Sequence, residues 1–267
     1  LAPAVNAIQM RDRAQATVEG TRLQARYEGI SIFNASGAAT RNVVVGCSTG
    51  IWANGECLVG DIAGNVVQGC RSGISIGGFG TVAGSIRGNI VSDATQVGVI
   101  VVCGARAADV TDNIVTNCAS VAVGVCGPVA VDEIVGNTLS GGQYGVFVHG
   151  SGSAGRVSGN AISGATIDGI RAYGDAGPVT GNSIIGSAEC GVLISGSGAF
   201  AEVSGNQISA CGTDGIRVEK GAQLGAAGTN VIQDCQGSGI YVGGPGTTAG
   251  PLSGNTVNDC DWGMWVH

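Results

Sequence analysis

The sequence contains few charged residues and few aromatic side chains. Asp, Glu, Lys and Arg make up only 12% of the 267 residues, against about a quarter in typical globular proteins. Aromatic residues account for 4%, so any core must be built mostly from small aliphatic side chains. The formal net charge is −7 and no basic run is present, so we expect no nucleic acid partner. No apolar stretch reaches the roughly 18 residues that a membrane span needs, and membrane insertion is therefore not expected.

Glycine is abundant instead, with 50 residues, and Asn recurs at a nearly constant interval. Ten Asn residues follow one another at steps of 22–25 residues: Asn42, Asn65, Asn89, Asn113, Asn137, Asn160, Asn182, Asn206, Asn230 and Asn255. Gly precedes seven of them, and an aliphatic residue lies two positions after every one. Eight or nine positions after each Asn comes a second marker, a Gly followed by an aliphatic residue, with Ala122 in the Gly position of one repeat. The chain is therefore an array of internal repeats.

Within each repeat, apolar and polar residues alternate over four or five positions between Gly and Asn turns. This pattern predicts short strands and tight turns, and no helix. A repeat of about 24 residues cannot bury its own apolar face, so the repeats must stack. We predict an all-β fold over residues 1–267, a single right-handed parallel β-helix (solenoid) of about ten to eleven coils with three short strands per coil. The first partial coil is expected at residues 1–16 and a truncated last coil near residues 255–267.

Neither end of the chain shows the polar capping element that a solenoid needs. Thr21 already fits the Asn position of an early coil, and the last coil stops soon after Trp262. We therefore expect a piece of a longer protein, a chain that associates end to end with copies of itself, or a cap of a kind that the sequence pattern does not reveal.

The repeat, of the form V-x-G-N-x-I-x-x-C-x-x-x-G-I-x-V, resembles that of the pectin-lyase-like superfamily over essentially the full length of the chain. That superfamily holds lyases, hydrolases, epimerases, phage tailspikes and adhesins. The resemblance implies a right-handed parallel β-helix and a substrate groove on the outer face of the Gly-Ile strands. We expect an extracellular or cell-surface location. The sequence lacks the Asp clusters of polygalacturonases, the Asp-Pro-His-Asp motif of alginate epimerases and the Arg-x-Pro-x-x-Arg motif of pectate lyases. No specific enzyme family is therefore matched.

Six of the ten Cys residues lie five positions after an Asn of the repeat: Cys47, Cys70, Cys118, Cys211, Cys235 and Cys260. Such a column predicts a stack of small buried side chains, with disulfides or a metal as alternatives. Parallel Cβ vectors fit a disulfide poorly, and a column along an axis does not converge on a metal ion. We predict no metal ligands. Cys190 lies outside the column and is expected to face solvent.

The motif Asp-Gly-Ile-Arg occurs at residues 168–171 and again, 46 residues or two coils later, at residues 214–217. Because the Ile of each motif belongs to the inward aliphatic column, the Arg side chain points outward. The two motifs are therefore expected about 10 Å apart on one face. That face also gathers polar and aromatic residues: Tyr144, Phe147, His149, Tyr173, Glu219 and Tyr241.

A row of polar groups flanked by aromatic rings suits a hydroxyl-rich chain such as a polysaccharide or another glycan. We assign catalytic roles to Asp168, Arg171, Asp214 and Arg217, and substrate binding to Tyr144, Phe147, His149, Tyr173, Glu219 and Tyr241. The resemblance implies a lyase in which Arg acts as the base and acid-bound Ca²⁺ assists, so Ca²⁺ is the one cofactor that we consider. A hydrolase would instead use two carboxylates about 5–10 Å apart.

Two alternatives involve no chemistry at these residues. Asp and Arg three positions apart can form an exposed ion pair that contributes about 0–1 kcal/mol. The whole chain can equally be a non-catalytic structural solenoid, such as a shaft, fibre, adhesin or tailspike-like module.

Overall fold

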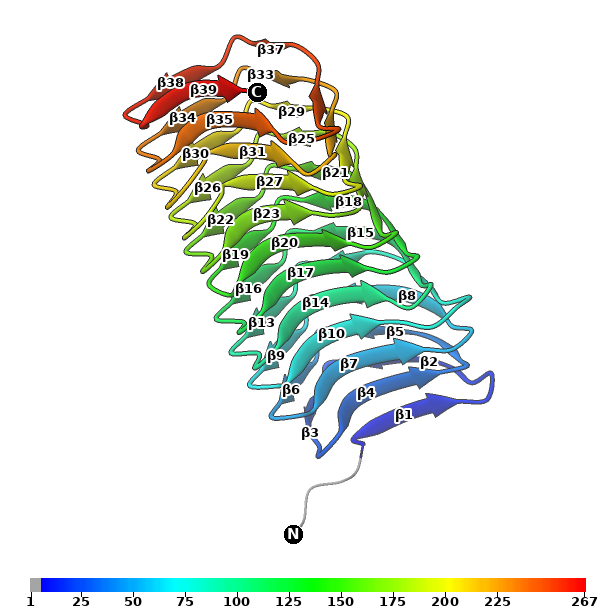
Figure 1. The fold of residues 1–267 in the computed structure, drawn as a ribbon. Helices are drawn as coiled ribbons and strands as arrows, with labels where there is room; N and C mark the ends of the chain where they lie inside the picture. The colour runs from blue at the N-terminus through cyan, green and yellow to red at the C-terminus, as the bar shows by residue number, and fades with distance from the viewer. Residues whose placement is uncertain (1–5) are drawn as a thin grey trace.

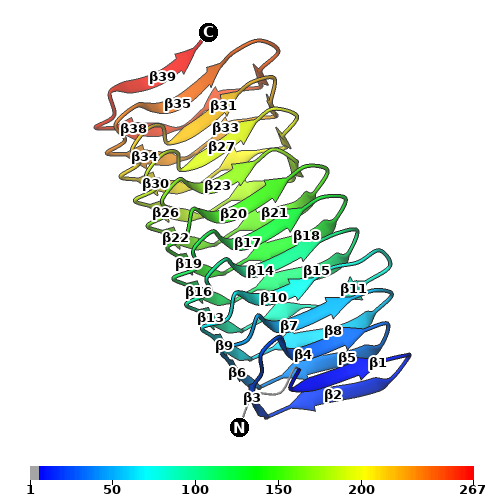
Figure 2. The ribbon, with the colours of Figure 1, turned by 60° about the horizontal axis from the view of Figure 1, so that its bottom comes forward.

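The structure, a computed structural model, describes residues 6–267, and residues 1–5 at the start of the expected first partial coil lie outside the described residues. It confirms the predicted fold: a right-handed parallel β-solenoid of about eleven coils, with no helix among the described residues. Successive coils stack along one axis, and the chain runs from one end of the rod to the other (Figures 1 and 2).

Three parallel sheets form the sides of the rod, and each coil contributes to all three. Sheet A carries the Gly-Ile strands β1 (Ile8–Arg11), β4 (Glu28–Phe33), β7 (Thr49–Asn54), β10 (Ser72–Ile76), β14 (Val97–Val102), β17 (Val121–Cys126), β20 (Tyr144–His149), β23 (Asp168–Ala172), β27 (Val192–Ser195), β31 (Ile216–Glu219), β35 (Ser238–Gly243) and β39 (Trp262–Val266). Sheet C, which follows the Asn turns, carries the three-residue strands β3 (Arg22–Gln24), β6 (Val43–Val45), β9 (Val66–Gln68), β13 (Ile90–Ser92), β16 (Ile114–Thr116), β19 (Thr138–Ser140), β22 (Ala161–Ser163), β26 (Ser183–Ile185), β30 (Gln207–Ser209), β34 (Val231–Gln233) and β38 (Thr256–Asn258).

Sheet B lies between sheet A and the Asn turns, and in several coils its strand is broken in two. Its strands are β2 (Gln15–Glu19), β5 (Ser36–Thr40), β8 (Leu58–Ala63), β11 (Val82–Ala83), β12 (Ile86–Arg87), β15 (Arg106–Thr111), β18 (Ala130–Val135), β21 (Ser153–Ser158), β24 (Asp175–Ala176), β25 (Val179–Thr180), β28 (Ala199–Phe200), β29 (Val203–Ser204), β32 (Gln223–Leu224), β33 (Ala227–Gly228), β36 (Thr248–Ala249) and β37 (Leu252–Ser253). Pro178 and Pro251 lie in two of the breaks, where a residue without an N–H group cannot continue the ladder.

The recurring Asn residues form a buried ladder along the axis, at the turn between sheets B and C. Asn137 shows the pattern: its Nδ2 donates to Asn160 Oδ1 of the next coil (2.9 Å) and to the Val110 carbonyl (2.8 Å). Its own Oδ1 accepts hydrogen bonds from the backbone and side-chain amides of Asn113. Thr21 occupies this position in the early coil, as predicted, and its N–H donates to Asn42 Oδ1. The ladder therefore satisfies buried backbone groups at every turn.

The core is a stack of inward aliphatic side chains from all three sheets, including Ile170, Ile184 and Ile216. The marker Gly is needed because the next coil approaches closely at that point. A Cβ atom on Gly169 would overlap Ile184 Cγ2, and one on Gly215 would overlap Ile232 Cγ2. The inward residues of each coil are therefore fixed by packing, and the side chains on the outer faces of the sheets are the ones that can contact a ligand or partner.

Candidate functional site

The outer face of sheet A brings the predicted site residues into one row. β20, β23, β27, β31 and β35 lie side by side in that order (Figure 1). In the register of the sheet, Phe147 pairs with Arg171, Arg171 with Leu193, Leu193 with Arg217, and Arg217 with Tyr241. The two Arg residues are therefore two strands apart with Leu193 between them, as the repeat predicts.

The first motif forms a clamp around a buried carboxylate. Arg171 Nη1 donates to Asp168 Oδ2 at 3.1 Å and to Tyr144 Oη at 3.2 Å, while its Nη2 donates to Tyr173 Oη. The guanidinium lies between the two Tyr rings, 5.4 Å from the centroid of Tyr144 and 5.0 Å from that of Tyr173. Arg171 Nε is buried without a hydrogen-bond partner. Three of the five guanidinium N–H groups of Arg171 are therefore used within this motif.

The second motif repeats this arrangement and adds a second ion pair. Arg217 donates through Nη1 to Asp214 Oδ2 at 2.7 Å and through Nε to Glu219 Oε2 at 2.8 Å. Lys220 Nζ lies 2.9 Å from Glu219 Oε1. Although burial opposes it, hydrogen bonds from Lys220 and Arg217 hold the pKa of Glu219 below its ordinary value. The Arg217 guanidinium also stacks on Tyr241, 4.3 Å from the ring centroid.

The Asp–Arg ion pairs of the alternative interpretation do form, but their carboxylates are buried and not exposed. Asp168 is 0% exposed and Asp214 is 3% exposed. Each uses its second oxygen to accept a backbone N–H of the following coil: Asp168 Oδ1 from Cys190 at 2.9 Å, and Asp214 Oδ1 from Ser238 at 2.6 Å. These Asp residues therefore take part in the coil-to-coil hydrogen bonding much as the Asn ladder does, and they orient the Arg side chains above them.

Burial has a direct effect on the ionisation of the first motif. Desolvation raises the pKa of Asp168 to about 6, although the Cys190 N–H and the Arg171 guanidinium favour the charged form. Cys190 was expected to face solvent, and that expectation is wrong: its side chain is buried. Burial raises the pKa of the Cys190 thiol to about 12, so it is not a nucleophile at neutral pH.

Two aromatic groups flank the clamps. On one side, Phe147 stacks with Tyr144 at 4.8 Å and with His149 at 5.4 Å between ring centroids, and Tyr173 meets His149 edge to face at 5.7 Å. On the other side, Tyr241 lies 6.0 Å from Trp265 and 5.5 Å from His267. The structure thus places all ten residues assigned to the site on or beside sheet A.

A shallow pocket of about 280 Å³ lies between the two clamps. The residues that line it are Arg171, Glu189, Cys190, Leu193, Thr213, Arg217, Glu219 and Lys220. Leu193 places an apolar side chain between Arg171 and Arg217. Glu189, Thr213 and Lys220 also line the pocket, and they were not assigned to the site from the sequence. The only feature of the sequence that could have indicated Lys220 as a site residue is its position directly after Glu219. The pocket can accept a ligand that combines polar groups with a small apolar face.

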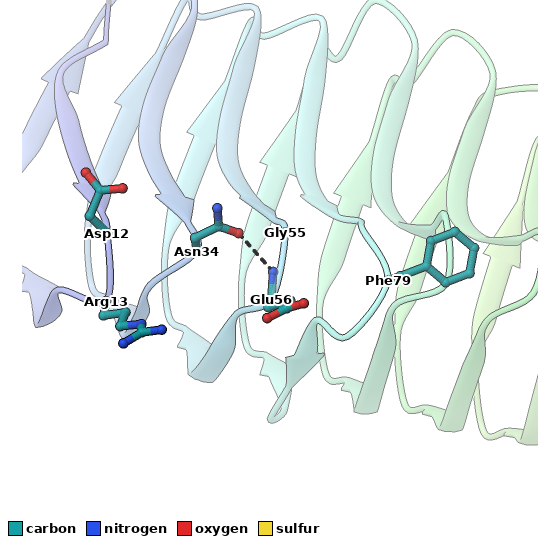
Figure 3. Close-up of a pocket in the computed structure, with 6 residues that line it drawn as sticks. All are labelled: Asp12, Arg13, Asn34, Gly55, Glu56 and Phe79. Atoms are coloured by element: carbon teal, nitrogen blue, oxygen red, sulfur yellow. Dashed lines mark hydrogen bonds between the residues drawn. The ribbon is translucent and has the colours of Figure 1, made fainter.

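A second hollow, of about 540 Å³, lies at the corner between sheets A and B near the start of the chain. Asp12, Asn34 and Glu56 contribute polar groups, and Phe79 lies at its far side (Figure 3). Asn34 Oδ1 accepts the Glu56 N–H at 3.1 Å, which fixes the turn. Among residues 6–267, the buried polar atoms without a hydrogen-bond partner belong to other residues than those lining this hollow. We therefore assign no ligand to the hollow.

The Cys column is a packed stack. Cys47, Cys70, Cys118, Cys211 and Cys235 are buried, and none of the ten thiols forms a disulfide. The column thiols donate weak hydrogen bonds to the carbonyl two residues earlier, as Cys70 does to Gln68 at 3.6 Å. They thus behave as small apolar residues with a weak donor.

The N-terminal part of the chain, residues 4–130, matches the family model described as "Periplasmic copper-binding protein (NosD)". No curated protein and no solved structure matches the chain. Residues 6–267 include no helix of the length and apolarity that crossing a membrane requires.

The family model described as "Right handed beta helix region" matches residues 130–267, just over half of the chain. The same coil geometry continues without interruption on both sides of residue 130 in all three sheets. By its repeat, its fold and this match, the chain belongs to the right-handed β-helix family.

Proposed function

We propose that this β-helix is an extracytoplasmic module that binds a carbohydrate chain along the outer face of sheet A. The observation that carries the proposal is the pocket between the Arg171 and Arg217 clamps, bounded on both sides by aromatic groups. Aromatic rings pack against the C–H faces of sugar rings, and guanidinium and carboxylate groups form charge-assisted hydrogen bonds with hydroxyls.

The dimensions of the site fit a short oligosaccharide. From β20 to β35 there are four strand-to-strand steps, or about 19 Å at 4.8 Å per step. Phe147 stands at one end of this distance, Leu193 at its centre and Tyr241 at the other end. A chain that lies along the rod axis would therefore meet an aromatic group, the pocket and a second aromatic group in turn.

The geometry favours binding over turnover. Asp168 and Asp214 are buried, and each has both oxygens engaged, so neither is placed to give or take a proton at a sugar. The acidic partners Glu219 and Asp214 raise the pKa of Arg217 in spite of burial, so it stays protonated and is less available as a general base than an ordinary Arg. We therefore propose that these four motif residues position the binding surface, and their assigned catalytic roles stay predictions.

The family match bears on the location of the protein, whereas its own residues decide whether a metal ion fits. The name of the family that matches residues 4–130 refers to a periplasmic copper-binding protein, which supports an extracytoplasmic setting where polysaccharides are met. Copper itself does not fit the residues: residues 6–267 hold no cluster of three or more His, Cys, Asp or Glu side chains placed to bind a metal ion. The Cys residues lie in a column along the axis and do not converge. Ca²⁺ stays a prediction, because the carboxylates of the site are already paired with Arg or Lys.

Glycan-array binding tests the proposal, with neutral and uronate-containing oligosaccharides as probes. The parent protein should bind a subset of the array. Arg217→Lys, which keeps the charge but removes the planar fork, and Tyr241→Ala, which removes the ring, should each weaken binding at least about tenfold. Arg156→Ala is the matched control, because Arg156 forms an exposed ion pair with Glu133 on sheet B. Absence of binding by the parent, or equal losses in the control, would refute a sugar site on sheet A.

A second candidate function, a structural solenoid that stacks end to end, is supported by one observation. β39 carries two large aromatic side chains, Trp262 and Trp265, at exposed positions. Light scattering that shows rods growing with protein concentration, abolished by Trp262→Glu, would favour this function. A constant mass over the same concentrations would exclude it.

A further inference from the structure

The outer face of sheet C is almost without charge. In each of its eleven three-residue strands the middle side chain points into the core and the two outer ones point away. These outward positions number 22, and Arg22, in the first strand, is the one charged residue among them. The others are Val, Ile, Ala, Ser, Thr, Gln and Asn. On a protein with a net charge of −7, the outward strand positions of this face carry no acidic side chain. The nearest acids, Asp93, Asp112, Asp234 and Asp259, lie in the turns at its edges.

Sheet B provides the contrast on the same rod. Its outer face carries charged residues in most coils, among them Asp61, Arg87, Glu133 and Arg156, which form exposed ion pairs. Two copies of an acidic protein repel each other where such faces meet. Apart from Arg22 in its first strand, the outward strand positions of sheet C let a second copy approach without burying charged side chains.

Exposed aliphatic side chains are concentrated on this uncharged face. Ile90, Ile114, Ile185 and Val231 are 41–51% exposed and all point outward from sheet C. Val43 and Val66 continue the ridge of Ile90 and Ile114 toward the start of the chain. Val43, Val66, Ile90 and Ile114 form one contiguous row, whereas Ile185 and Val231 are separate exposed positions in the second half of the face. A contiguous row of exposed aliphatic groups marks an interaction surface.

The face is also regular and unobstructed. All eleven strands pair in continuous register without a bulge, and they stand in one straight row in both views (Figures 1 and 2). Most turn residues on either side are Gly in a left-handed conformation, such as Gly88 and Gly164. The charged residues in these turns are Arg41, Asp93, Asp112, Asp234 and Asp259, and Asp93 accepts a hydrogen bond from Gln68 on the face. The pocket on this face, lined by Ile185, Gln207 and Val231 among others, measures only about 100 Å³. Such a surface fits another flat surface and not a small ligand.

We propose that a second copy of this chain docks on the outer face of sheet C, forming a symmetric dimer of two rods side by side. Eleven strands give a face about 50 Å long and about 10 Å wide, or about 500 Å² in projection per copy. With its 22 outward residues, this face lies at the small end of the range for stable interfaces, which have roughly 20–30 residues and about 800 Å² per side. Two copies related by a two-fold axis parallel to the strands place Val43 opposite Val231 and Ile114 opposite Ala161. Sheet A lies on another side of the rod, so the sugar site stays accessible in the dimer.

Molar mass in solution tests the dimer, measured by light scattering after size-exclusion chromatography. The parent should elute with twice the 26.1 kDa of one chain, and Ile90→Lys/Ile114→Lys should elute as a monomer. The matched control is Leu58→Lys/Val82→Lys, which places two lysines at exposed aliphatic positions of sheet B and should leave the dimer intact. Ile185→Lys, in the other half of the face, should also weaken the dimer.

Circular dichroism and the melting temperature verify that each variant is folded, because Lys at an exposed strand position leaves the core unchanged. A parent that is monomeric at micromolar concentrations overturns the proposal. So does a dimer that both double variants disrupt equally. Masses that grow beyond two chains and fall with Trp262→Glu would assign the association to the end of the rod, and would likewise overturn it.

Discussion

Gly169 and Ile184, in adjacent coils, are packed so closely that a Cβ atom on Gly169 would overlap Cγ2 of Ile184. The same relation holds for eight other marker glycines, each of which faces a Val or Ile of the next coil. The one coil with Ala at the marker, Ala122, has Leu139 two positions after the next Asn. Leu is not branched at Cβ, so it leaves room where Val and Ile place a γ-methyl group. Gly with a β-branched residue, and Ala with Leu, are thus two solutions to one packing problem.

This relation predicts that Gly169→Ala destabilises the fold by about 1–3 kcal/mol, because the new methyl group overpacks the core. Adding Ile184→Leu should recover part of that loss, since it removes the overlapping methyl group. Recovery should be incomplete because the Cβ atom would also crowd the Gly191 carbonyl. Urea unfolding of the single and double variants measures both effects.

Gly263→Ala is the control, because it occupies the same position in a coil where nothing lies within 4 Å of the added Cβ atom. It should change the free energy of unfolding by less than about 0.5 kcal/mol. If Ile184→Leu adds its own loss to that of Gly169→Ala without any recovery, the packing explanation is wrong.

The sequence predicts the fold because each repeat places the same residue type at the same point of the coil. The Asn spacing alone locates the ladder, and the aliphatic residue after each marker locates the core. The site is predicted less completely. The position of Asp168 before its Gly shows that it lies at a turn, but not that the turn is closed by the Cys190 N–H of the next coil. Likewise the uncharged face of sheet C appears only once the coil has been closed and the 22 positions lie side by side.

The Asn ladder makes a prediction about stability. Asn137→Ala should destabilise the fold by about 2–5 kcal/mol, because the backbone and side-chain amides of Asn113 lose their acceptor in a buried site. Asn258→Ala, at an exposed outward position of β38, should be nearly neutral. Thermal unfolding compares the two. Equal melting temperatures for both variants would mean that the ladder contributes little to stability.

The raised pKa of Asp168 predicts how the free energy of unfolding depends on pH. Its pKa is raised from 3.8 to about 6 in the folded protein, so the folded state binds the proton more tightly than the unfolded chain. The contribution of this group to the free energy of unfolding is therefore fully present below pH 4 and is lost as the pH rises through 6, by about 3 kcal/mol in total. Asp168→Asn, which cannot ionise, should lack this component.

The measurement is urea unfolding of the parent and Asp168→Asn between pH 4 and 7. The difference in the free energy of unfolding between the two proteins should change in favour of the variant across the range from about 4 to 6. A difference that stays constant with pH would show that Asp168 keeps an ordinary pKa in the fold.

Thiol labelling separates accessibility from ionisation. A hydrogen bond with the neighbouring Cys70 lowers the pKa of Cys47 to about 7 in spite of burial, and this would make Cys47 reactive if a reagent could reach it. Cys47 is buried, whereas Cys103 is exposed. We expect iodoacetamide to label Cys103 first in the folded protein, and Cys47 only after denaturant is added, as read by peptide mass spectrometry. Cys103→Ser should remove the fast phase. Labelling of Cys47 at the rate of Cys103 in the folded protein would show that the coils open far more often than their continuous hydrogen bonding allows.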